Sequence, residues 1–373
     1  MVTDYLSWAR DTSDAVDTCA NCYNLASSSI EEPTDLLLKH SQRLHVDGLR
    51  QTLNEPDGWG QPSVIAALGA RYNIPAPSER ILLTTGASGA YIIVAHALVN
   101  AGEHVIIEAP TYQPFVKVMQ SVGADITRVP RRSDDDALDL EAIEAAVTAK
   151  TAFIVISNLH NPSATYTDEA TLRDLAVIAR RHGLHVLVDE IYHDFVVGSR
   201  PAALVDDVFI TISSLTKVYG LALLRCGWMI AAPDVIQRIR PTHAIYGNGT
   251  SRFTHAMVAR LLTDFAAYRD HWQTIVRQNR ASAESILTPL IDDGMLIGNI
   301  PAQGCVYFPR VAGLDDVGAL VQWLADERRI RVVPGHFFGA PAHIRIGLGR
   351  KPDETRAGLQ QLAEALRLYR AKM

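Results

Sequence analysis

The sequence has no surplus of positive charge and no long hydrophobic run, and each absence excludes a class of protein. The 373-residue chain holds 35 Lys and Arg against 41 Asp and Glu, a formal net charge of −6. That balance argues against nucleic acid or an anionic membrane as the main partner. No apolar run reaches the roughly 18 residues that a membrane helix needs, since polar residues interrupt even the stretch 87–101.

The first residues also lack the apolar region of a secretory signal. Residues 1–17 carry four Asp instead, so we expect no signal peptide and a soluble, cytoplasmic protein. Apolar residues form 48% of the chain and charged residues 20%, which is typical of a globular protein. At about 150 residues per domain, this length predicts two or three domains.

Cysteine is scarce, and the four residues present are Cys19, Cys22, Cys226 and Cys305. Only Cys19 and Cys22 lie close in sequence. A structural zinc site would need two more ligands at matching spacing, and a thioredoxin-like pair would follow a strand, whereas this pair precedes every expected strand. We therefore expect no metal site and four reduced cysteines.

Short apolar segments alternate with longer amphipathic segments between about residues 62 and 240. This alternation predicts βαβ units and a mainly parallel sheet. Ser88 and Asp168 are suitable helix N-caps. The expected strands are 81–84, 104–108, 153–156, 185–188, 209–212 and 228–231, and the expected helices are 88–99, 112–121, 140–147 and 168–182.

The pattern changes after about residue 250. It predicts a smaller α+β unit, on which the first 45 residues are expected to dock. The expected division is a large domain over 46–274 and a small domain built from 1–45 and 275–373. The elements expected after residue 250 are helices over 255–290, 317–327 and 352–369 and strands over 305–308, 330–333 and 344–347.

The most informative polar segment follows the expected strand 209–212. There Lys217 lies close to Ser214 and Thr216, with Arg225 eight residues further on. A lysine near another cation can have the lowered pKa that Schiff-base chemistry needs, and the hydroxyls with Arg225 could hold a phosphate. The alternative is a surface loop with one solvated lysine.

Three further segments also follow expected strands. Asp189 lies at the carboxyl edge of the sheet, where α/β enzymes keep their sites, although an N-cap aspartate has the same pattern. Residues 84–90 form a small-residue turn suited to an anion, without a dinucleotide or P-loop motif. Asn161 precedes Pro162 and is restricted to an extended or turn conformation; by itself this segment is only a turn.

Together these segments resemble the class I and II aminotransferase family, pyridoxal-phosphate (PLP) enzymes of fold type I. The resemblance runs from about residue 20 to 365 and implies an α/β fold with a mainly parallel central sheet, a smaller α+β domain and PLP as cofactor. Its motifs, in order, are Gly-Ala-Ser at 86–88, Pro-Thr-Tyr at 110–112, His-Asn-Pro at 160–162, Asp-Glu-x-Tyr at 189–192, Ser-x-Thr-Lys at 214–217 with Arg225, and Arg345.

The resemblance implies a role for each residue around the PLP ring. Lys217 would bind PLP as a Schiff base and then move a proton during the reaction. Asp189 would keep the pyridine nitrogen protonated and so make the ring an electron sink. Asn161 and Tyr192 would hydrogen-bond the phenolic oxygen, and Tyr112 would stack on the ring.

The resemblance also implies the groups that hold the phosphate and the substrate. Arg345 would bind the substrate α-carboxylate, with Ser28 as a further substrate contact. The phosphate would be held by Ala87, Ser88, Ser214 and Arg225.

Several positions depart from the family pattern on the substrate side and the phosphate rim. The tyrosine that reaches the neighbouring subunit's phosphate is replaced by Leu53 or Glu55, depending on the glycine used for alignment. The family's His-Asn-Pro-Thr-Gly becomes His-Asn-Pro-Ser-Ala at 160–164, and Leu223 stands where many relatives have Gly. The N-terminal substrate loop is Ala-Ser-Ser-Ser at 26–29.

These departures bear on the substrate. No arginine stands where dicarboxylate-specific relatives keep a second one, although Arg252 is nearby, so a dicarboxylic donor is not favoured. The segment 245–252 is expected to approach the partner subunit's site. The serine-rich loop, Pro309-Arg310 and the segment 333–339 are similar to a subgroup that includes capreomycidine synthase.

We therefore expect an aminotransferase that moves an amino group between an amino acid and a 2-oxo acid, working as a homodimer. The alternative keeps PLP but performs elimination, replacement or cyclisation of an amino acid in secondary metabolism. A transcription regulator with an aminotransferase-like domain would need an additional DNA-binding domain. Neither nucleic acid nor a membrane is an expected partner.

Overall fold

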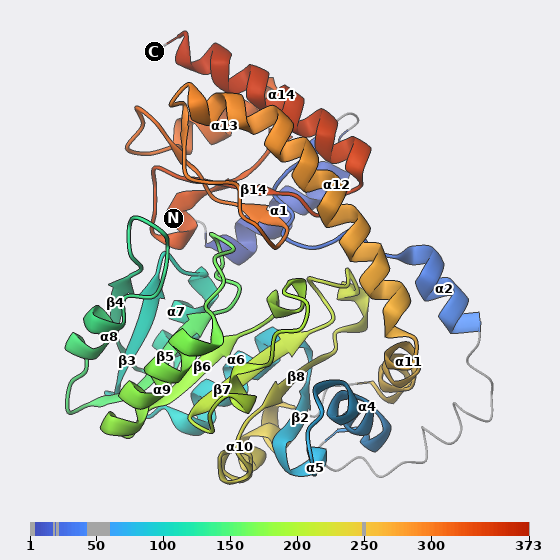
Figure 1. Cartoon of the computed structure of the whole chain (residues 1–373), viewed down its shortest axis with the longest axis vertical. Coiled ribbons are helices and arrows are strands. Elements are labelled where there is room, and N and C mark those ends of the chain that lie inside the picture. Colours follow the sequence, from blue (N-terminus) through green and yellow to red (C-terminus); the bar gives the residue numbers. More distant parts are fainter. Residues whose placement is uncertain (1–3, 18, 20–21, 43–59, 248–250, 373) are drawn as a thin grey trace.

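The computed structural model describes residues 4–17, 19, 22–42, 60–247 and 251–372 (Figure 1). A seven-stranded sheet has the strand order β2-β8-β7-β6-β5-β3-β4. Strand β8 runs antiparallel to both of its neighbours, and the other pairings are parallel, which confirms the mainly parallel sheet. Its strands are Ile81–Thr84 (β2), His104–Ala109 (β3), Asp125–Pro130 (β4), Thr151–Ser157 (β5), His185–Asp189 (β6), Phe209–Ser214 (β7) and Gly227–Ile230 (β8).

Side chains of the central strands alternate between two hydrophobic cores, one on each face of the sheet. Val105 and Val155 join one core with residues of α6 and α7. Ile106 and Ile154 join the other core with residues of α4 and α9. Because both faces are covered, these strands are continuous apolar runs. The helices around the sheet are Pro62–Tyr72 (α4), Pro77–Arg80 (α5), Gly86–Leu98 (α6), Gln113–Ser121 (α7), Leu140–Ala145 (α8), Glu169–His182 (α9) and Pro233–Tyr246 (α10).

The structure of this sheet region contains elements that were not expected, among them helices α4, α5 and α10. Strand β4 was not expected, because it is a largely exposed edge strand without an apolar run. Asp168 is the N-cap of α9, where its carboxylate accepts a hydrogen bond from the N–H of Thr171 at 2.8 Å. Ser88 is not an N-cap, because α6 begins at Gly86 and leaves Ser88 inside the first turn.

The C-terminal part of the chain is built on α12, which lies beside α14 (Figure 1). The single helix expected over 255–290 is two helices, because the chain leaves helical conformation at Asp264. The strand expected over 330–333 is likewise two short strands. The elements are Arg252–Leu262 (α11), Phe265–Asp292 (α12), Leu296–Ile297 (β9), Val306–Tyr307 (β10), Arg310–Val311 (β11), Gly318–Glu327 (α13), Ile330–Arg331 (β12), Val333–Pro334 (β13), Ile344–Gly347 (β14) and Pro352–Arg370 (α14).

The N-terminal segment contacts both parts of the molecule. Its elements are Tyr5–Asp17 (α1), Tyr23–Asn24 (β1) and Thr34–Gln42 (α2). Strand β1 pairs in parallel with β12, and Leu25 joins a third core with α12 and α14. Helix α1 contacts α7, and α2 contacts α11. The domain division at residues 46 and 274 stays a prediction.

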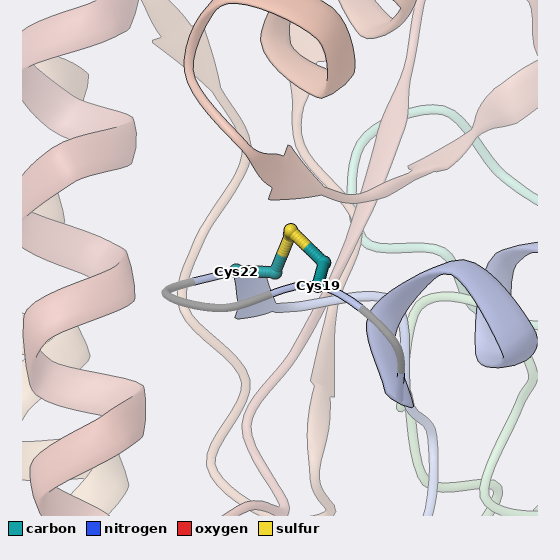
Figure 2. The surroundings of a disulfide bond; sticks show 2 residues. All are labelled: Cys19 and Cys22. Carbon is teal, nitrogen blue, oxygen red and sulfur yellow. A yellow bond between two sulfur atoms is a disulfide. The ribbon is translucent and has the colours of Figure 1, made fainter.

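Cys19 and Cys22 form a disulfide (Figure 2), so the expectation of four reduced cysteines is wrong for this pair. Their Cα atoms lie 5.7 Å apart, within the range that a disulfide needs. Cys226 and Cys305 are free and buried, and burial raises the pKa of each thiol to about 12.

Among the described residues, no group of three or more His, Cys, Asp or Glu is arranged to hold a metal ion. No helix in the described ranges is both long and apolar enough to cross a bilayer.

Gly227 on β8 packs directly against the backbone where α6 begins. A Cβ at Gly227 would lie 2.5 Å from the carbonyl carbon of Gly86 and 2.8 Å from its Cα. Because backbone cannot rotate away as a side chain does, we expect Gly227→Ala to lower the free energy of unfolding by about 1–3 kcal/mol. Urea denaturation measures this change.

Gly89 in α6 provides the matched control. A Cβ there would lie 3.7 Å from the Cβ of Thr85, an ordinary van der Waals distance. Alanine is also the better helix former by about 0.8–1.0 kcal/mol, so Gly89→Ala should keep or slightly raise stability. Equal stability of the two variants would contradict the proposed backbone clash.

Candidate active site

A cavity of about 200 Å³ lies where strands β5, β6 and β7 end. It brings together residues that are far apart in the sequence. Most of the residues predicted for the site line it, as does Thr216, whose hydroxyl was named as a possible phosphate contact, whereas Tyr5, Tyr91 and Ile191 were not predicted. The lining consists of Tyr5, Ser28, Ala87, Ser88, Tyr91, Tyr112, Asn161, Asp189, Ile191, Tyr192, Thr216, Lys217 and Arg225.

Two predicted residues lie behind this lining. Ser214 is buried at the end of β7, and its hydroxyl accepts a hydrogen bond from the N–H of Thr216 at 3.2 Å. Thr216 thus faces the cavity where Ser214 was expected. Arg345 on β14 is fully buried and donates hydrogen bonds to Asn161 and Tyr5, which both line the cavity.

Lys217 follows β7 and presents its amine to the cavity. Its Nζ donates a hydrogen bond to Ser28 Oγ at 3.3 Å. The surrounding protein lowers the pKa of this amine mainly by removing water, and the charge of Arg345 lowers it further. The fraction of free, nucleophilic amine therefore rises, in contrast to the alternative of a solvated loop lysine.

Asp189 ends β6 with its carboxylate buried. Burial raises its pKa to about 6, although hydrogen bonds from Tyr91 and from the N–H of Ile191 oppose that rise. The alternative role as an N-cap does not hold, because the short 3-10 helix that follows, His193–Phe195, starts after Tyr192. A buried carboxylate of this kind is stabilised by a cationic partner.

Arg345 is held by neutral partners on several sides. One terminal nitrogen donates to Asn161 Oδ1 at 3.2 Å, and the other donates to the Tyr5 hydroxyl at 3.1 Å and the Ala26 carbonyl at 3.3 Å. Its buried Nε has no partner in the described part of the chain. Because no described carboxylate pairs with Arg345, a carboxylate ligand would complete this site.

The backbone of Asn161 is held in place by a hydrogen bond to Ser157. Its N–H donates to Ser157 Oγ at 3.0 Å. Ser157 in turn donates from its N–H and its hydroxyl to Glu108, at 2.6 and 2.7 Å. Glu108 also forms a buried ion pair with Arg131 at 2.7 Å.

The first turn of α6 and Arg225 form a cradle for an anion. Ala87 and Ser88 lie in that turn, whose N–H groups have no helical partner. The guanidinium of Arg225 approaches the same turn, donating to the Thr85 carbonyl at 3.5 Å. The contact between Gly86 and Gly227 leaves no room for a Cβ beneath this cradle.

Two aromatic residues complete the walls. Tyr192 is buried and its hydroxyl donates to the Ser28 carbonyl at 2.9 Å. Tyr112 packs edge to face against Tyr5, with ring centroids 5.3 Å apart, and against Phe115. Its hydroxyl has a strongly raised pKa because it is buried.

Several positions discussed for the substrate lie partly or wholly elsewhere. Leu53 and Glu55, the positions of the missing tyrosine, lie outside the described residues, as do residues 248–250. Arg252 begins α11. Leu223 is exposed in a short 3-10 helix beside Arg225.

The donor set of this cavity fits PLP. It combines a lysine amine, a buried carboxylate without an ion pair among the described residues, an aromatic side chain and an anion cradle at a helix N-terminus. Together with the mainly parallel sheet, these groups define a PLP-dependent enzyme of fold type I.

Comparison with known proteins narrows this class. The family model of the class I and II aminotransferases matches residues 14–366, so the chain belongs to this family. It is 26% identical over 312 residues to capreomycidine synthase of Streptomyces vinaceus, covering 82% of this chain and 79% of the relative. It is also 26% identical over 301 residues to an arginine–pyruvate transaminase of Pseudomonas aeruginosa, covering 77% and 74%.

Solved structures show the same fold. A PLP-dependent aminotransferase from Streptococcus suis superposes with a TM-score of 0.84 at 25% identity, covering 96% of this chain and 97% of that one. The family and the fold are PLP-dependent, so PLP is the cofactor and the chain is a PLP-dependent aminotransferase.

The raised pKa of Asp189 predicts a pH dependence of stability in the cofactor-free protein. The pKa of this carboxyl rises from its ordinary value of 3.8 to about 6 in the folded protein. Between these two values the folded protein keeps the proton that the unfolded chain loses. The stability from this group is therefore complete below the unfolded pKa and is lost as the pH rises through the folded one. That loss is about 3 kcal/mol between about pH 3 and about pH 7.

Asp189→Asn should remove this loss, so the variant should gain stability relative to wild type as the pH rises. Denaturant unfolding of cofactor-free protein across the pH range measures the difference. Asp174→Asn is the control, because Asp174 is exposed on α9, and it should follow wild type. Parallel curves for wild type and Asp189→Asn would contradict the prediction.

Proposed function

We propose that the protein transfers an amino group between an amino acid and a 2-oxo acid, with PLP held in the cavity of about 200 Å³. One observation carries this proposal most directly: the amine of Lys217, with its lowered pKa, shares that cavity with the buried carboxylate of Asp189. PLP, when bound, supplies an electron sink for the substrate Cα.

Lys217 would first hold the cofactor and later handle the substrate proton. Because the surrounding protein disfavours its ammonium form, its Nζ can accept the proton from Cα. The hydrogen bond to Ser28 Oγ keeps the amine at the cavity wall. These contacts support Lys217 as both the attachment point and the base.

Arg345 would bind the substrate α-carboxylate and so orient Cα toward Lys217. Its guanidinium is fixed by Asn161 and Tyr5, which lowers the entropy cost of recognising a carboxylate. Ser28 lines the same cavity and is the proposed further substrate contact.

The remaining predicted residues would hold the cofactor. Asp189 would bind the protonated pyridine nitrogen, which would supply a cationic partner for its buried carboxylate. Asn161 and Tyr192 would face the phenolic oxygen, and Tyr112 would pack on the ring. The phosphate would be bound by Ala87, Ser88 and Arg225 at the start of α6, with Ser214 beneath and Thr216 at the cavity wall.

A second reaction type is elimination, replacement or cyclisation on the same cofactor. It is favoured by the likeness to capreomycidine synthase, which is as similar in sequence as the transaminase relatives. Release of ammonia without transfer to a 2-oxo acid would identify this reaction.

The half-reaction tests the proposed transfer. Amino acids added without a 2-oxo acid should convert bound PLP to pyridoxamine phosphate, measured by chromatography after denaturation. Lys217→Ala should lose covalent PLP, seen by absorbance, and slow the conversion by about 100-fold or more because the base is gone.

The control for Lys217→Ala is Lys150→Ala, because Lys150 is exposed, and this variant should keep wild-type conversion. Full turnover by Lys217→Ala would reject the assignment of Lys217. Failure of every amino acid to yield pyridoxamine phosphate in wild type would reject amino transfer itself.

We further propose that the protein is a homodimer, as the family resemblance implies. Exposed apolar side chains support this: Leu223, two residues before Arg225, is 70% exposed, and in the segments that flank residues 248–250 in the sequence Ile245 is 75%, Tyr246 51% and Phe253 55% exposed. Exposed apolar side chains in one region are typical of an interface. The cytoplasmic location stays a prediction.

Sedimentation velocity tests the dimer. Wild type should sediment as a dimer, and Ile245→Asp should shift the equilibrium toward monomer because it places a charge in an apolar contact. Val177→Asp is the control, since Val177 is 55% exposed on α9 and should leave the dimer intact. A monomeric wild type, or an unchanged Ile245→Asp, would contradict this interface.

A further inference from the structure

A hydrogen bond and aromatic packing hold helix α1 against residues beside the cavity. The backbone N–H of Tyr5 donates to Gln113 Oε1 on α7 at 2.7 Å. The Tyr5 ring packs against Tyr112 at 5.3 Å and Phe337 at 5.7 Å between centroids. Helix α1 therefore joins the sheet region to the C-terminal segment directly beside the cavity.

Tyr5 is buried, with 8% of its surface exposed, and its hydroxyl lies among polar groups of the site. That hydroxyl accepts a hydrogen bond from Arg345 at 3.1 Å. Burial alone would raise the pKa of the phenol, but the charges of Arg345 and Lys217 and a hydrogen bond with Ser28 lower it below its ordinary value. The phenol oxygen is therefore an electron-rich acceptor for the guanidinium.

We propose that Tyr5 is a positioning residue that orients the Arg345 guanidinium for the α-carboxylate of an amino acid. This inference rests on the proposed function, because it assigns the carboxylate subsite to Arg345. The partners of the two terminal nitrogens are Asn161, Ala26 and Tyr5, and Tyr5 is the only side chain of the N-terminal helix among them. Without its hydroxyl, one side of the guanidinium loses its fixed partner.

The same helix also lines a neighbouring cavity of about 320 Å³, which shares Tyr5, Ser28 and Lys217 with the first. Trp8, Thr12 and Ser13 of α1 form one of its walls. Docking of α1 therefore sets the orientation of Arg345 and encloses space beside the substrate at the same time.

Tyr5→Phe tests the proposal, because phenylalanine keeps the ring packing and removes only the hydroxyl. The probe is 2-aminoisobutyrate, an amino acid without a Cα hydrogen, which can bind the holoenzyme but not complete transfer. We expect Tyr5→Phe to raise its Kd by about tenfold, measured by the absorbance of the bound cofactor.

Propylamine, which has an amine but no carboxylate, should bind wild type and Tyr5→Phe equally. Leu6→Ala is the matched variant, since Leu6 is exposed on the same helix, and it should leave both Kd values unchanged. PLP content and circular dichroism of each variant report on folding.

An unchanged Kd for 2-aminoisobutyrate in Tyr5→Phe would overturn the proposal. A tighter Kd would overturn it too, because it would mean that the hydroxyl competes with the carboxylate. Equal weakening for propylamine would show a general structural role and also overturn it. If wild type binds the probe with this dependence on Tyr5 but transfers no amino group, the proposed function fails and the role of Tyr5 stands.

Discussion

The buried ion pair between Glu108 and Arg131 holds the residues that position Asn161 in the site. Glu108 lies near the end of β3, Arg131 follows β4, and Ser157 ends β5. The Glu108 carboxylate pairs with Arg131 and accepts hydrogen bonds from the N–H and the hydroxyl of Ser157, so it joins three neighbouring strands. Burial raises the pKa of Glu108, and the charge of Arg131 with the hydrogen bonds of Ser157 opposes this rise. Removing one partner of such a pair typically costs about 3–5 kcal/mol. The ion pair therefore holds together the ends of β3, β4 and β5, and the chain that leaves β5 carries Asn161 to the cavity.

From this ion pair, hydrogen bonds lead without interruption to the substrate side of the cavity. Ser157 Oγ accepts from the Asn161 backbone, and Asn161 Oδ1 accepts from Arg345 on β14. Arg345 continues to Tyr5 of α1. Residues from both ends of the chain thus meet in one buried network, and the low polarity around it strengthens each bond while penalising any missing partner. This explains how the proposed carboxylate subsite can be rigid although its residues come from distant segments.

Much of the sheet could be predicted because its strands are buried on both faces. Continuous apolar runs such as 104–108 and 185–188 gave strand positions close to those observed. Strand β4 was not predicted because an exposed edge strand needs no apolar run. The break at Asp264 was not predicted because amphipathic spacing continues through it. The pairing of Cys19 with Cys22 depends on the distance between the two residues in the fold, which their spacing in the sequence does not define. The nature of the cofactor followed from ordered motifs, not from periodicity.

The sequence by itself determined the class of fold, the family and the residues with distinctive chemistry, such as Lys217 and Asp189, since their motifs are local and keep their order. Only the tertiary structure decided which of them share a cavity and which residues are buried behind the cavity wall. It placed Thr216 at the wall in front of Ser214 and brought Tyr5 to Arg345, 340 residues away. No local pattern marks Tyr5, because an aromatic residue on an amphipathic helix has the same appearance in any core. Its environment arises from packing between segments that are distant in the chain, and that packing is a property of the whole fold.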